Sequence, residues 1–108
     1  MAADATLAER IRRRLARRKG IREKRMFGTG FLLNGNLCLG VWQASLVVRL
    51  GPEAAEEALT EPHVGQFAFQ GRAMNGWVLV APEGVQDDDR LDDWIQRALK
   101  FVGKLPAK

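Results

Sequence analysis

The side chains best suited to covalent chemistry are His63, Ser45 and Cys38, and each of these residue types occurs once in the chain. Nucleophilic catalysis needs a hydroxyl or thiol within hydrogen-bonding reach of a base, and no local motif joins any two of the three. We therefore interpret Cys38 as a small buried hydrophobic residue and His63 as a surface or capping residue. The sequence predicts a protein that is not an enzyme.

Metal sites are also disfavoured by the residues present. A structural zinc site wants four Cys or His ligands, and the chain has one of each. The aspartates of segment 87–93 lack the Gly and Glu spacing of a calcium-binding loop, whereas acidic residues are favoured at a helix start by the helix dipole. We expect no metal.

Gly28-Thr29-Gly30 invites comparison with a dinucleotide-binding loop. Leu33 stands where that fingerprint has its third glycine, and an apolar run follows in place of a helix. We interpret these glycines as turn residues and expect no cofactor.

Basic side chains are concentrated near the N-terminus. Residues 1–25 hold ten Lys and Arg against three acids, a net charge of +7, and residues 26–108 carry −3. Such a segment is typical of a solvated face, a phosphate-contacting surface or a docking surface for acidic proteins, and we leave these alternatives open. The candidate polyanion- or partner-binding residues are Arg10, Arg13, Arg14, Arg17, Arg18, Lys19, Arg22, Lys24 and Arg25.

These residues are positioned first by a predicted amphipathic helix over residues 1–20. Thr6 and Glu9 have the spacing of a capping box, which places the helix start near residue 6, and Gly20 is a plausible C-terminal cap. Leu7, Ile11 and Leu15 recur at helical spacing and form the apolar stripe. Arg10, Arg13, Arg14 and Arg17 fall on the opposite side, so we expect a basic outer face.

Strands are predicted next. Ile21–Phe27 indicates the first strand, and Asn34-Gly35 is a strong hairpin signal because both turn positions must accept positive φ. Gln43-Ala44 predicts a second tight turn into the strand Ser45–Leu50. These segments indicate an antiparallel meander.

The second half alternates helix and strand. Gly51-Pro52-Glu53 opens a short helix that ends before Pro62, and alternating phenylalanines indicate a strand around Phe67. Residues 71–76 are expected to connect it to a strand over Trp77–Ala81. A final helix begins near residues 87–89, and its apolar residues recur at helical spacing on one face: Leu91, Trp94, Ile95, Ala98 and Val102.

The whole chain, residues 1–108, is expected to form one α+β domain. A two-layer sandwich is predicted, in which residues 21–108 supply an antiparallel sheet of about five to six strands and a closing helix. The N- and C-terminal helices and the short central helix would cover one face. The other face would be solvated or carry a partner.

Two segments, Lys24–Asn36 and Gly71–Val78, resemble the N-terminal domain of the TfoX/Sxy competence-regulator family. The resemblance covers roughly residues 20–108, and Ala73 stands where the family usually has proline. The family-motif positions, which we interpret as mainly structural, are Met26, Phe27, Gly28, Gly30, Phe31, Asn34, Gly35, Gly71, Arg72, Met74, Gly76 and Trp77.

The resemblance implies a stand-alone, non-enzymatic regulatory domain that acts through protein contacts, as an accessory factor in competence-type transcriptional regulation. The alternative is a weak, sequence-independent nucleic-acid-binding module that uses the basic helix. We expect an unidentified protein partner, leave nucleic acid and homodimerisation open, and expect no membrane partner. The lone cysteine and the lack of a signal sequence favour the cytoplasm.

Overall fold

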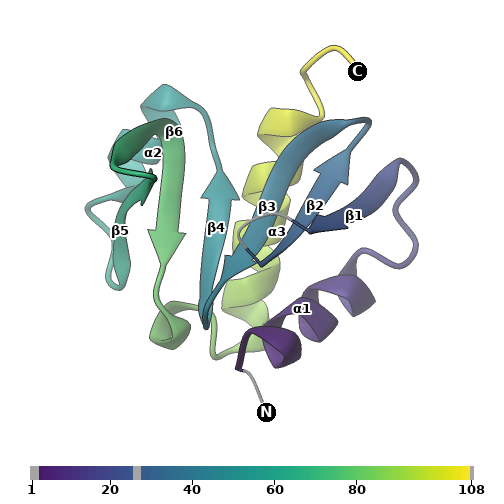
Figure 1. The fold of residues 1–108 in the computed structure, drawn as a ribbon, viewed down its shortest axis with the longest axis horizontal. Helices are drawn as coiled ribbons and strands as arrows, with labels where there is room; N and C mark the ends of the chain where they lie inside the picture. The colour runs from purple at the N-terminus through teal and green to yellow at the C-terminus, as the bar shows by residue number, and fades with distance from the viewer. Residues whose placement is uncertain (1–2, 26–27, 108) are drawn as a thin grey trace.

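The computed structural model describes residues 3–25 and 28–107, and it forms two layers (Figure 1). The elements follow in the order α1 (Ala3–Arg14), β1 (Ile21–Arg25), β2 (Thr29–Leu33), β3 (Asn36–Trp42), β4 (Ser45–Arg49), α2 (Pro52–Ala58), β5 (Val64–Phe69), β6 (Arg72–Val80), a 3₁₀ turn η1 (Pro82–Gly84) and α3 (Asp88–Val102). All strand pairs are antiparallel, in the order β1-β2-β3-β4-β6-β5. The predicted α+β sandwich with an antiparallel sheet is confirmed.

The predicted hairpin turns organise one half of the sheet. Asn34 and Gly35 have φ values of 53° and 86°, as a two-residue hairpin turn between β2 and β3 requires. Gln43, with a φ of 56°, occupies the equivalent turn between β3 and β4. Local turn chemistry therefore sets the register of three consecutive strands.

The N-terminal helix differs from its predicted limits. It begins at Ala3 and ends at Arg14, so Thr6 lies inside it and is not its cap. Beyond Arg14 the backbone tightens into turns, in which the Arg18 amide donates to the Leu15 carbonyl at 3.0 Å. These turns keep Leu15 buried while they redirect the chain into β1. Gly20, with a φ of 84°, ends this connection and does not cap the helix.

The expected connection over residues 71–76 is wrong, because β6 already begins at Arg72. The turn is Gln70-Gly71, whose φ values are 54° and 78°. Gly76 is an irregularity within the strand: its carbonyl accepts hydrogen bonds from the amides of Leu50 and Gly51 at 2.9 and 3.1 Å. The glycine at position 76 thus brings β6 close to the end of β4, and Trp77 lies inside the strand.

The first strand was expected to reach Phe27. It runs to Arg25, and Met26 and Phe27 lie outside the described residues. No sequence signal indicated η1, which directly follows the strand predicted to end at Ala81.

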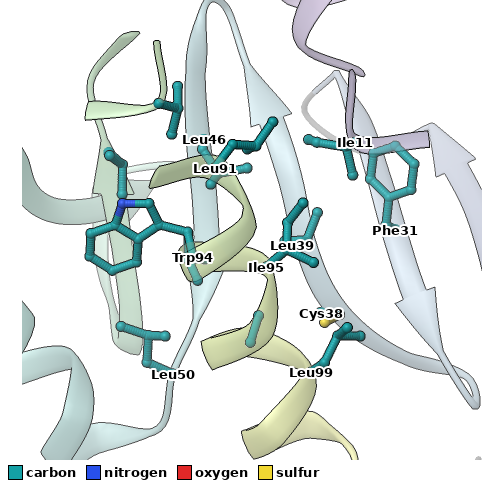
Figure 2. Close-up of a cluster of buried hydrophobic side chains, with 14 of the residues drawn as sticks. Ile11, Phe31, Cys38, Leu39, Leu46, Leu50, Leu91, Trp94, Ile95 and Leu99 are labelled. Atoms are coloured by element: carbon teal, nitrogen blue, oxygen red, sulfur yellow. The ribbon is translucent and has the colours of Figure 1, made fainter. Parts of the chain in front are cut away.

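The hydrophobic core lies between the helices and one face of the sheet (Figure 2). The predicted apolar stripe is buried: Leu7 and Ile11 come from α1, and Leu15 comes from the turn that follows it. The predicted stripe of α3 is also buried and faces alternate residues of the central strands. Its residues are Leu91, Trp94, Ile95, Ala98 and Val102. Burial of this stripe is what attaches the helices to the sheet.

A smaller aromatic cluster lies on the other face, which we call the open face because α1, α2 and α3 pack on the opposite side. Arg49 pairs with Trp77 across β4 and β6, one position beyond the core pair Val48 and Val78, so both residues belong to the open face. Phe67 lies 5.8 Å from the ring of Trp42 and 6.3 Å from the ring of Trp77, between centroids.

Gly28 and Gly71 both have a positive φ, but only Gly28 lies against another strand, so the two positions separate backbone strain from steric overlap. Gly28 has a φ of 114°, and a Cβ there would overlap the carbonyl oxygen of Val41, whereas Gly71 has a φ of 78° and open space around it. We expect Gly28→Ala to lower the free energy of unfolding by about 2–4 kcal/mol, from strain plus overlap. Gly71→Ala should cost about 1–2 kcal/mol. Chemical denaturation measures both, and equal costs would contradict the predicted overlap.

Candidate polyanion or partner surface

Of the nine basic residues proposed from the sequence, Arg10, Arg13 and Arg14 form ion pairs and the other six do not, within the described residues. Arg10 and Arg14 lie against the start of α3: Nη2 of each lies 3.1 and 3.0 Å, respectively, from Oδ1 of Asp88. Nε of Arg14 is also 2.6 Å from Oδ1 of Asp92. The two arginine side chains are only 24% and 22% exposed. We call this set of four residues the clasp, because it joins α1 to α3.

A second ion-pair set joins α1 to the first strand. Arg12 contacts Glu23 on β1 with two nitrogens, at 2.6 Å from Nε and 2.9 Å from Nη2, and also contacts Glu9. Arg13 lies 3.5 Å from Glu9 and remains 75% exposed. The expected outer face was Arg10, Arg13, Arg14 and Arg17. Arg13 and Arg17 are exposed, Arg17 just beyond the helix, but the expectation is wrong for Arg10 and Arg14, because their partners lie on α3.

The remaining six cations are all exposed, and in the described part of the chain none of them forms an ion pair. They lie on the connection after α1 and along β1. We call them the basic corner: Arg17, Arg18, Lys19, Arg22, Lys24 and Arg25. Their unneutralised charge makes the basic corner the part of the proposed surface that can still attract an anion.

A cleft of about 450 Å³ between α2 and α3 was not foreseen. Its apolar lining includes Leu50, Ala58 and Phe101. On its rim Arg97 pairs with Glu61 at 2.7 Å and lies over the Trp94 ring, at 4.4 Å from its centroid. The sequence offered no signal for it, because the two helices that form it are separated in the chain by residues 59–87.

The three candidate catalytic side chains occupy different surroundings. Cys38 is buried in the core on β3, and burial raises the pKa of its thiol to about 12. Ser45 begins β4, and His63, with a φ of 67°, precedes β5. Among the residues described, no group of three or more His, Cys, Asp or Glu side chains is placed to hold a metal ion.

The family-motif positions are mostly structural in placement. Gly30 and Phe31 lie in β2, and Phe31 is a core residue. Gly71 belongs to the hairpin turn, and Arg72, Met74, Gly76 and Trp77 lie in β6.

Comparison with known proteins identifies the family of this chain. The family model described as the TfoX N-terminal domain matches residues 13–102, which is most of the chain. No curated protein and no solved structure matches the sequence. None of the helices in the described residues is long and apolar enough to cross a membrane.

Cys38 should be unreactive in the folded protein. With its pKa raised to about 12, the thiol is protonated at neutral pH, and the thiolate is the reactive species. We expect an aromatic disulfide reagent at pH 8 to label Cys38 only after denaturant is added. Rapid labelling of the folded protein would contradict this burial.

The clasp should make the free energy of unfolding depend on pH in the acidic range. Hydrogen bonding from Arg10, followed by the charge of Arg14, lowers the pKa of Asp88 below its ordinary value of 3.8. A carboxylate with a lowered folded-state pKa stabilises the fold above the unfolded value, and this contribution is lost as pH falls through the folded value. Asp88→Asn should therefore lower the free energy of unfolding at pH 7 and have progressively less effect below pH 3.8.

The control is Asp89→Asn, at the exposed neighbouring position, which makes no ion pair in the described structure. Denaturant unfolding at several pH values compares the two variants. A pH-independent loss in Asp88→Asn would contradict a charge-based clasp.

Proposed function

This chain belongs to the TfoX N-terminal domain family, and from that premise we propose that it is a regulatory interaction domain that has no catalytic activity of its own. The family is not a known enzyme family. The proposed role is that of an accessory factor in competence-type transcriptional regulation, exerted through contacts with a protein. The family match over residues 13–102 is the observation that carries this proposal.

The basic corner is the proposed docking surface. Its six cations are exposed, while Arg10 and Arg14 are already engaged by Asp88 in the clasp. Guanidinium groups suit bidentate pairing with carboxylates, so an acidic surface on a protein of the transcription machinery is the complementary partner. The clasp, the Arg12–Glu23 pair and the core attach α1 beside this corner, so the backbone that carries the cations has a defined position.

A nucleic-acid partner is the second candidate. The observation that favours it is the continuity of the cations, with no described carboxylate partner from Arg17 to Lys19 and again at Arg22, Lys24 and Arg25. Phosphate contacts of this kind would be electrostatic and would carry no base information. Nuclease treatment distinguishes the two candidates, because it removes a nucleic-acid partner and leaves a protein partner bound.

The test is affinity capture from native lysate, with and without nuclease. We expect a protein partner that survives nuclease treatment, is released by salt, and is lost when Arg17, Arg18 and Lys19 are all changed to Gln. The matched control removes the same charge from exposed positions on and just after α3: Arg90, Lys100 and Lys104, all changed to Gln. The control should retain the partner.

Each other outcome is informative. Loss of capture after nuclease alone would replace the protein partner with nucleic acid. Equal capture by the triple variant and wild type would remove the basic corner as the docking surface.

A further inference from the structure

Acidic residues are almost absent from the sheet. Within the ranges of the six strands the only one is Glu23, and it lies in β1. Glu23 pairs across the sheet with Phe31, a core residue, and its carboxylate binds Arg12 of α1, so it points to the helix layer. The other acids of the described chain lie in helices and connections. The open face consequently has no acidic side chain among the described residues.

Basic side chains do project from that face. Arg22 and Lys24 flank Glu23 in β1, and because successive residues of a strand alternate, they lie on the side opposite to it. Both are exposed. Arg49 adds a third cation at the end of β4. The open face therefore carries two cations at its β1 edge and a third at the end of β4, where the guanidinium of Arg49 reaches around the end of the sheet toward Phe101 of α3.

Arg49 is held in an unusual way for a surface arginine. Its guanidinium carbon lies 5.6 Å from the centroid of Trp77 and 5.9 Å from that of Phe101. Nη1 donates to the Leu37 carbonyl at 3.3 Å, and no carboxylate in the described chain pairs with it. Two rings and a backbone carbonyl thus fix the group while its charge stays unneutralised, which suits it to receive a phosphate.

Aromatic rings lie next to these cations. Phe67 is 2% exposed and forms the buried centre of the cluster, in contact with Trp42 at an interplanar angle of 76° and with Trp77 at 47°. Trp42 and Trp77 are half-buried and retain accessible surface. Rings combined with a positively charged surface are the two components by which single-stranded nucleic acids are bound without sequence preference.

We propose that the open face binds single-stranded nucleic acid, with phosphates at Arg49, Arg22 and Lys24 and with bases stacked on Trp77 and Trp42. This site goes beyond the proposed protein-docking role: it shares Arg22 and Lys24 with the basic corner, and it adds Arg49 and the two rings. Unpaired bases can reach the rings, whereas the stacked bases of a duplex cannot. A second copy of the chain is a poor occupant, because two such faces would bring cations against cations.

The test is a fluorescence titration with an oligothymidylate of about 12 nucleotides, a length within the usual range of such sites. A Trp94→Phe background removes the core tryptophan and leaves Trp42 and Trp77 as reporters. We expect stacking to quench their emission, and a duplex of equal length to bind more weakly. Trp77→Leu should weaken binding by about 5-fold to 100-fold.

A substitution of Arg49 tests the proposal more specifically, because the slope of log affinity against log salt depends on the number of phosphates that the protein neutralises. Arg49→Gln should weaken binding and reduce the slope of log affinity against log salt by about 0.7, the value of one phosphate on a single strand. Arg49→Lys should keep the slope, because it keeps the charge. Arg90→Gln, which removes an exposed arginine of α3, should change neither quantity. Circular dichroism checks that each variant is folded.

The proposal is overturned if the oligonucleotide does not bind, if duplex binds as well, or if Arg49→Gln leaves both affinity and slope unchanged. It is also overturned if changing Arg17, Arg18 and Lys19 to Gln abolishes binding while Arg49→Gln does not. The capture experiment detects a nuclease-resistant protein, whereas the titration detects an oligonucleotide, so either proposal can fail while the other stands.

Discussion

Burial of one face of the six-stranded sheet against α1 and α3 is the constraint from which the other features follow. Four residues of the central strands are completely buried: Leu39, Val41, Leu46 and Val48. The apolar stripe of α3, which includes Ile95, packs against this face of the sheet (Figure 2). Since strand side chains alternate, fixing these residues toward the helices also fixes which residues point the other way. The orientation of Arg22, Lys24, Arg49 and Trp77 is thus a consequence of how the core is packed.

Packing of α1 beside α3 also decides how charge is distributed. The apolar stripe that buries Ile11 brings Arg10 and Arg14 to the acidic start of α3, where Asp88 and Asp92 accept them. Acidic side chains near a helix N-terminus interact favourably with the helix dipole. These aspartates therefore stabilise α3 and also form ion pairs with α1. The cations of the basic corner, which form no ion pair in the described residues, lie on the connection after α1 and on β1.

The result is a domain whose two layers differ in chemistry. The helix layer carries nearly all the described acids, many of them already paired, and the mixed-charge cleft between α2 and α3. The sheet layer carries unpaired cations and partly accessible rings. The proposed protein-docking surface and the proposed single-strand site therefore meet at Arg22 and Lys24, which are exposed and belong to both.

Much of the fold could be predicted from the sequence because its signals are local. Asn34-Gly35 defines a turn by the φ values it tolerates, and the stripe around Trp94 and Ile95 defines α3 by its period. What the tertiary structure alone decided are the long-range pairings. The partner of Arg10 is more than 70 residues away, and Gly76 is in a strand, not a turn, because of its approach to Gly51. The rings beside Arg49 likewise come from β6 and α3, and no local pattern records which elements will become neighbours.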